Sequence, residues 1–207
     1  MFDGFLRDFG RAIDMKRHGE WTDVPPREQL SRQAGVHAFE ATSRAGNPFP
    51  DTSSADASAY LSRGHLFLNR GDLAKALGEF DKAIKLDPHA ELAYIAYLER
   101  GLIDGTLKNY ENALIDYDRA IELRPEYPEA YLLRGQVYDF LDEHEEAIVD
   151  YTKAIELKPG FANAYAHRGF ALEALGRSCQ AVEDWKVAAD MGDERAAGIL
   201  GRKGIMR

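Results

Sequence analysis

The sequence contains a single cysteine, Cys179, among 207 residues, and it has no CxxC pair. A disulfide within the chain and a cysteine zinc site are therefore excluded. No apolar run approaches the roughly 18 to 20 residues that a membrane-spanning helix requires. The first residues include Asp3, Arg7 and Asp8, where a secretory signal would need an apolar stretch. We therefore expect a cytoplasmic protein.

Basic residues are scarce relative to acidic ones. Lysine and arginine number 26 against 35 aspartate and glutamate residues, which gives a formal net charge of −9. This charge repels phosphate backbones and anionic lipid headgroups, so nucleic acid is not expected as a partner. The composition, 45% hydrophobic and 29% charged, is that of a folded globular protein.

The motifs that carry catalysis and metal binding are also missing. The six histidines form no HExxH motif and no His-x-x-x-His pair, so the sequence does not support a metal site. It contains no GxSxG elbow and no GxxxxGK[ST] loop. We therefore predict no catalytic residues, no cofactor and no metal, in a protein that is not an enzyme.

What the sequence does contain is a five-residue motif, here called the first phrase, that occurs four times: YLSRG from Tyr60, YLERG from Tyr97, YLLRG from Tyr131 and YAHRG from Tyr165. A second phrase begins 20 residues after the first in every case: FDKAIKLDP, YDRAIELRP, YTKAIELKP and the degraded WKVAADMGD. The glycines of the first phrase follow one another at intervals of 37, 34 and 34 residues. A fixed period of 34 residues predicts a solenoid.

Within each repeat, apolar and small residues recur at helical spacing in two halves, which predicts a hairpin of two helices. Proline follows the second helix in three repeats, where it cannot continue the helical hydrogen bonds. Gly71 and Gly176 lie between the two halves of the first and last repeats. The glycine of the first phrase lets the two helix backbones approach, while the aromatics fill the space on either side.

This combination resembles the tetratricopeptide repeat family, which places an aromatic, Gly, an aromatic, Ala, an aromatic, Ala and Pro at set offsets. The third repeat carries all of them, as Tyr131, Gly135, Tyr138, Ala147, Tyr151, Ala154 and Pro159. The resemblance implies an all-α solenoid of four helix-turn-helix hairpins over 57–193, at 57–90, 94–127, 128–161 and 162–193. The second repeat departs with Asp104 and Lys108, which predicts a looser hairpin. Its three additional residues are expected to lengthen its first helix by almost one turn.

An arginine precedes each of the four glycines, and an acid follows it after 16 residues: Arg63 and Glu79, Arg100 and Asp116, Arg134 and Asp150, Arg168 and Asp184. We predict an ion pair between the two helices of each hairpin. The alternative is a row of arginines that grips a carboxylate or phosphate ligand. It is disfavoured because acids at a constant offset would already neutralise the arginines.

Residues outside the repeats predict an extension at each end. In the first 17 residues, five large apolar side chains share one helical face: Phe2, Phe5, Leu6, Phe9 and Ile13. Residues 27–45 predict a second helix and residues 41–56 a linker, which completes an N-terminal extension over 1–56. Residues 194–207 predict a C-terminal capping helix with Asp193 as its N-cap, followed by a basic tail.

The resemblance implies that the first helix of each hairpin lines a concave groove, with ligand-facing residues one, four, eight, eleven and twelve positions into each repeat. We select as partner-binding Leu61, His65, Leu98, Leu102, Leu132, Gln136, Phe140 and Phe170, with Glu129, Asp139 and Glu173 selecting basic partners. Relatives that clamp the acidic tails of chaperones use lysine and arginine on this face, and none stands at these positions here. Alternatively, the four leucines pack against neighbouring helices and the groove is smaller.

We therefore predict a noncatalytic scaffold or adaptor that binds a peptide or helix, apolar with basic flanks, in the concave groove. Residues 1–17 themselves have this chemistry, so the chain could dock them in its own groove, and a partner would then have to displace them. A different class is a self-assembling structural protein that uses the N-terminal helix or a terminal hairpin. The sequence leaves the partner's identity and the oligomeric state open.

Overall fold

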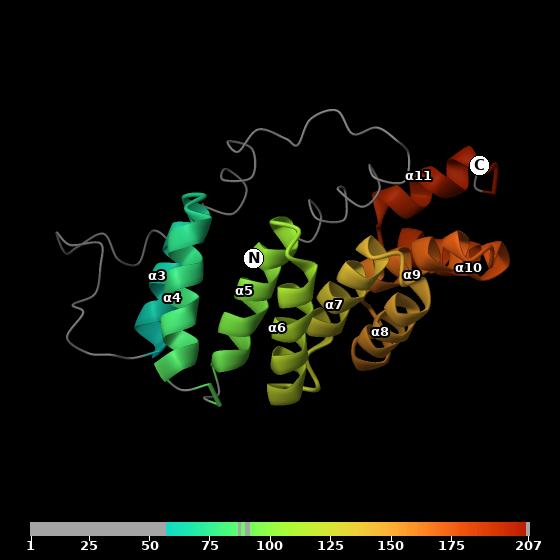
Figure 1. Cartoon of the computed structure of the whole chain (residues 1–207). Helices are drawn as coiled ribbons and strands as arrows, with labels where there is room; N and C mark the ends of the chain where they lie inside the picture. The colour runs from blue at the N-terminus through green and yellow to red at the C-terminus, as the bar shows by residue number, and fades with distance from the viewer. Residues whose placement is uncertain (1–56, 87, 90–91, 206–207) are drawn as a thin grey trace. The chain divides into compact units, whose positions relative to one another are not determined.

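A computed structural model of the chain describes residues 57–86, 88–89 and 92–205 (Figure 1). Over these ranges the chain forms only α-helices, which confirms the predicted all-α fold. They are α3 (Ala57–Asn69), α4 (Leu73–Leu86), α5 (Ala93–Thr106), α6 (Tyr110–Leu123), α7 (Pro128–Phe140), α8 (His144–Leu157), α9 (Ala162–Ala174), α10 (Ser178–Asp190) and α11 (Glu194–Arg202). The helices predicted in residues 1–17 and 27–45 and the linker at 41–56 lie outside the described residues.

The described part of the chain divides into two compact units at the boundary between Asn109 and Tyr110. The described part of the first unit comprises α3, α4 and α5, and that of the second comprises α6 to α11. None of the helices in the described ranges is long and apolar enough to cross a membrane.

In the first unit, α3 and α4 form a hairpin around a glycine and an aromatic ring. Gly64 on α3 faces Phe80 on α4 so closely that a Cβ atom at residue 64 would overlap the ring. The turn between the helices places Gly71 at φ 77°, a left-handed conformation that glycine adopts without steric cost. The Asp72 N–H donates to the carbonyl oxygen of Phe67 at 2.9 Å, which closes the end of α3.

The second unit repeats this arrangement in two complete hairpins, α7 with α8 and α9 with α10. A Cβ atom at Gly135 would lie 2.8 Å from Tyr151 Cε1, and one at Gly169 would lie 2.6 Å from Trp185 Nε1. Real Cβ atoms do not approach other heavy atoms this closely, so only glycine fits at either crossing. The predicted role of the repeated glycine, close approach of two helix backbones, is therefore confirmed in these hairpins.

The predicted lengthening of α5 is wrong. Helix α5 has 14 residues, one more than α3, α7 and α9. The other two additional residues lie in the connection from α4, which spans 87–92, whereas the later connections span 124–127 and 158–161. Pro88 cannot continue α4, and Leu92 is the N-cap of α5, so two of the three additional residues lengthen the connection and only one lengthens the helix.

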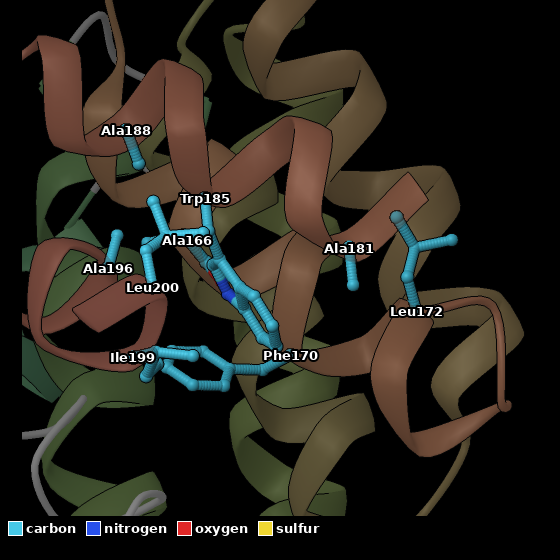
Figure 2. Close-up of a cluster of buried hydrophobic side chains, with 9 residues drawn as sticks. All are labelled: Ala166, Phe170, Leu172, Ala181, Trp185, Ala188, Ala196, Ile199 and Leu200. Carbon is cyan, nitrogen blue, oxygen red and sulfur yellow. The ribbon is translucent and has the colours of Figure 1, made fainter. Parts of the chain in front are cut away.

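Helix α11 closes the second unit, as the sequence predicted. The Asp193 carboxylate accepts a hydrogen bond from the Ala196 N–H at 2.9 Å and so caps the helix. Figure 2 shows its apolar side chains among those of α9 and α10, in a cluster of nine buried residues. The cluster consists of Ala166, Phe170, Leu172, Ala181, Trp185, Ala188, Ala196, Ile199 and Leu200.

Candidate partner-binding surface

The repeated arginines pair with acids inside their own hairpins. Arg134 holds Asp150 through two hydrogen bonds, from Nε at 2.8 Å and from Nη2 at 2.7 Å. Arg168 holds Asp184 in the same way, with both bonds at 2.8 Å. Arg63 Nε donates to Glu79 at 2.6 Å. Three of the four predicted ion pairs are therefore confirmed, and the fourth would join residues of the two units and stays a prediction.

Each arginine of the later hairpins also reaches back to the second helix of the preceding hairpin. Arg134 Nη1 donates to Asp118 on α6 at 2.5 Å, and Arg168 Nη1 donates to Thr152 on α8 at 3.1 Å. In the first unit, Arg100 Nη1 donates to Asp81 on α4 at 2.5 Å. Sequence reasoning missed these contacts, although a polar residue directly after the aromatic of the second phrase was the available signal.

The local environment keeps these arginines charged and fixed. The hydrogen bonds from Arg134 to Asp150 raise the pKa of the Arg134 guanidinium, and the bonds to Asp184 likewise raise the pKa of Arg168. Burial raises the pKa of the Asp150 carboxyl, and the hydrogen bonds from Arg134 oppose that rise. Each guanidinium also lies over the tyrosine three residues before it, with distances to the ring centroid from 4.6 to 5.8 Å. These arginines therefore serve the fold, which supports the structural interpretation over a ligand-binding row.

Four predicted groove residues belong to the first unit. Leu61, Leu98 and Leu102 are buried. His65 remains accessible, with 43% of its side chain exposed, and its Nε2 lies 3.1 Å from Glu99 Oε1 on α5. Its ring packs edge-on against Phe80 at 5.6 Å. In the first unit, His65 alone of these four keeps a surface that a partner can touch.

Four of the predicted groove residues in the second unit are apolar or neutral, and all are buried. Leu132 and Gln136 have no exposed surface. The Gln136 amide Nε2 donates to Nε2 of His167 on α9 at 3.1 Å. Phe140 stacks on Tyr110 of α6 with the ring centroids 5.5 Å apart. Phe170 packs in the cluster that α9 and α10 share with α11 (Figure 2).

The three predicted groove acids, also in the second unit, differ in access. Asp139 is buried, and it accepts hydrogen bonds from the Tyr151 hydroxyl and from His144 Nδ1, both at 2.8 Å. Glu129 and Glu173 stay partly exposed and bind lysines of the same unit, Lys158 at 3.0 Å and Lys203 at 2.6 Å.

The structure therefore gives the eleven predicted residues two different roles. Eight are buried, and burial of the four leucines favours the alternative in which they pack between helices and leave a smaller groove. The partly exposed ones are His65, Glu129 and Glu173. A sequence signal for the buried polar residues existed, because the eighth position of one repeat meets the fifth of the next: His65 meets Glu99, and Gln136 meets His167.

Charge separates the two units. Residues 57–109 contain 7 basic and 7 acidic residues, so their formal net charge is zero. Residues 110–207 contain 12 basic and 19 acidic residues, which gives a net charge of −7. The acidic surface that would attract a basic partner therefore belongs to the second unit.

Comparison with protein-family models gives three matches to tetratricopeptide repeats. Two models described as tetratricopeptide repeat match, one at residues 57–90 and the other at residues 128–161. A third model, described as TPR repeat, matches residues 101–139. The first two ranges coincide with the first and third predicted repeats. No curated protein matches the sequence.

Solved structures are similar over about two thirds of the chain. A crystal structure of MamA is 31% identical and covers 69% of this chain and 82% of its own, with a TM-score of 0.62. MamA residues 41-end from Desulfovibrio magneticus RS-1 are 26% identical, and the match covers 67% of this chain and 76% of that one, with a TM-score of 0.61. The first TPR of Spaghetti (RPAP3), bound to the HSP90 peptide SRMEEVD, is 25% identical, and the match covers 63% of this chain and 99% of that one, with a TM-score of 0.56.

Proposed function

Because this chain belongs to the tetratricopeptide repeat family, we propose that it is a noncatalytic scaffold that binds a basic, amphipathic peptide or helix along its first helices. The observation that carries the proposal is the charge of the ligand-facing positions, those one, four, eight, eleven and twelve residues into each repeat, which we call the inner positions. Two partly exposed carboxylates, Glu129 and Glu173, stand there, and no lysine or arginine occupies any of the inner positions. A ligand with basic residues complements the charge of this surface.

The peptide-bound Spaghetti domain supports binding of a short peptide, and its peptide differs in charge from the partner proposed here. The HSP90 peptide held by the Spaghetti domain, SRMEEVD, contains three acidic residues. A peptide of that charge would meet repulsion at Glu129 and Glu173 of this chain. We therefore propose the same kind of partner, a short segment, with the opposite charge.

Access decides which residues contact the partner. Side chains that are buried between helices, such as Leu132 and Gln136, shape the face without touching a ligand. In the second unit, Glu129 and Glu173 are the side chains that a ligand reaches. A lysine or arginine of the partner would take the place of Lys158 or Lys203 at the two carboxylates, so binding exchanges one ion pair for another.

Two designed peptides test this proposal. One is a fluorescein-labelled helix of leucine, alanine and lysine, with leucines every three or four residues, and the other replaces each lysine with glutamate. Fluorescence anisotropy of the intact chain is expected to show micromolar binding of the lysine peptide, equivalent to roughly −8 kcal/mol, and no binding of the glutamate peptide. Tighter binding of the glutamate peptide would overturn the proposal.

A pair of variants locates the site. The double substitution Glu129→Gln/Glu173→Gln is expected to weaken the lysine peptide by about 5- to 10-fold, as loss of two ion pairs predicts. The matched control, Glu183→Gln/Asp190→Asn on α10, removes the same charge from the outer surface. Equal weakening by both variants would mean that only the overall charge attracts the peptide.

A further inference from the structure

Successive first helices stack through one face, formed by the side chains two, five and nine positions into each repeat. These positions share a face because spacings of three and four residues correspond to about one helical turn. The fifth position contacts the preceding first helix, as Glu99 does with His65 and His167 does with Gln136. We call these positions the stacking face. In α5, α7 and α9 all of its side chains are buried: Ala96, Glu99, Ile103, Ala130, Leu133, Val137, Ala164, His167 and Ala171.

The stacking face of α3 is open. Ser62 is exposed, and Ala59 and Leu66 are only partly buried. No repeat precedes residue 57 in the sequence. Helix α3 nevertheless keeps the residues of a stacking face, because alanine occupies the second position and an apolar residue the ninth in all four repeats. A terminal repeat that met only solvent would need a polar outer face, so this face is built to be covered.

The arginine of α3 lacks the contact that its equivalents make. The arginines of the later first helices bind the preceding second helix at the residue directly after its buried aromatic, which is Asp81, Asp118 or Thr152. Within the described residues the acceptor of Arg63 is Glu79 of its own hairpin, and none stands on a preceding helix. The element that would complete α3 is therefore an apolar helix with an acid next to an aromatic side chain.

Residues 1–17 contain both of these features. Five large apolar side chains in this segment fall on one face of a helix. The sequence FDGFL from Phe2 has the same order as FDKAI from Phe80, namely an aromatic residue, an acid, any residue and two apolar residues. Asp3 thus corresponds to Asp81, which binds the arginine of the following first helix.

The length of the chain and the chemistry of α3 favour this occupant. Residues 18–56 separate the segment from α3, a stretch that reaches about 130 Å when extended, whereas α3 is about 20 Å long. A tether of this kind keeps the local concentration of the segment near the millimolar range, well above that of a second copy in dilute solution. Helix α3 contains no acidic residue, so its uncharged stacking face suits an apolar stripe.

We propose that residues 1–17 form a helix that covers the stacking face of α3, with Asp3 accepting a hydrogen bond from Arg63. The apolar stripe packs on Ala59, Ser62 and Leu66, as α11 packs its own apolar side chains on the last hairpin. This cap lies outside the inner positions, so it goes beyond the proposed function and leaves the groove free of residues 1–17.

Thiol labelling of the intact chain tests the cap. Ser62→Cys places a reporter on the stacking face, and Cys179, exposed on α10, is the reference in the same molecule. Mass spectrometry after brief iodoacetamide treatment measures both rates. We expect Phe5→Asp/Leu6→Asp, which interrupts the apolar stripe, to accelerate labelling at residue 62 by about 10-fold relative to Cys179, as opening of a local contact predicts.

A charge-matched control and the protein concentration separate the possible outcomes. Arg7→Gln/Arg11→Gln changes the net charge by the same amount on the opposite side of the helix, and it should leave the labelling rate unchanged. Equal rates with and without Phe5→Asp/Leu6→Asp would show that the face is open and would overturn the proposal. Protection that grows with protein concentration would identify a second copy as the occupant and overturn it as well. Either result leaves the proposed function standing, because binding of the lysine peptide reports on the inner positions.

A single substitution tests the ion pair to Arg63. Asp3→Asn is expected to accelerate labelling at residue 62 by about 2- to 5-fold, as loss of one surface ion pair predicts. Asp8→Asn removes the same charge from the same segment and should have no effect. Equal acceleration by the two variants would overturn the assignment of Asp3 as the acceptor.

Discussion

Within each unit, a side-chain contact links two successive first helices at the same repeat positions, but the residues that form it differ. In the first unit, His65 of α3 pairs with Glu99 of α5, and the imidazole stays open to solvent. In the second, Gln136 of α7 bonds His167 of α9, and both side chains are buried. The difference teaches that the eighth position of a repeat serves helix stacking in both units, and that its side chain stays accessible in the first unit and not in the second.

The largest expected effect concerns the buried leucines. Leu132→Ala in the second unit should cost about 2 to 5 kcal/mol of unfolding free energy, because it leaves a cavity where no surface is exposed. Leu61→Ala in the first unit should cost less, since Leu61 retains some exposure. Urea unfolding followed by circular dichroism measures both, and Trp185 fluorescence reports the second unit in a Trp21→Phe background.

Val149→Ala is the control for this pair, because Val149 is mostly exposed and its truncation should change stability by no more than about 0.5 kcal/mol. A small cost for Leu132→Ala together with weaker peptide binding would show that Leu132 faces the ligand.

An intermediate effect is expected from the arginines. Arg134→Ala removes hydrogen bonds to two helices and leaves Asp150 buried without its cation, which should cost about 2 to 3 kcal/mol. Arg63→Ala removes a single bond to Glu79, which Lys82 still holds at 2.6 Å, so about 1 kcal/mol is expected. Thermal unfolding of the two variants compares the losses, and equal losses would contradict the second contact of Arg134.

The smallest effect should come from the hairpin turns, and it should be stabilising. Lys108 adopts φ 65° and Asp142 adopts φ 62°, where Gly71 and Gly176 stand in the other hairpins. Lys108→Gly should gain about 0.5 to 1 kcal/mol by relieving the left-handed conformation. Asp142→Gly should gain less, because aspartate enters this region more readily. A destabilised Lys108→Gly protein in urea titrations would contradict the strain.

The sequence predicted the features that depend on one repeat alone. The first residues of α3, α7 and α9 are Ala57, Pro128 and Ala162, where the predicted repeats begin. The glycine crossings, the N-cap at Asp193 and three ion pairs were also predictable, because spacing within a hairpin determines them.

Features that depend on how successive hairpins stack were not predictable. His65 and Gln136 are polar and stand at positions that contact ligands in relatives, so they were predicted to bind a partner. Stacking of successive first helices also brings each of them against the next first helix, where Gln136 is buried and His65 stays partly exposed. Arg134 likewise contacts Asp118 of the preceding second helix, a contact that the periodicity within one repeat does not contain.

The back-reaching arginine also reveals where the chain accepts insertions. Arg134 finds its partner in the preceding hairpin 16 residues earlier, and so does Arg168. Arg100 finds Asp81 at 19 residues, because the connection before α5 is longer, and yet the equivalent atoms meet. The longer connection before α5 thus leaves the equivalent contact between successive repeats in place. The connection over 87–92 is accordingly the place where a tag, an epitope or a whole additional hairpin can be inserted with the neighbouring repeats left in register.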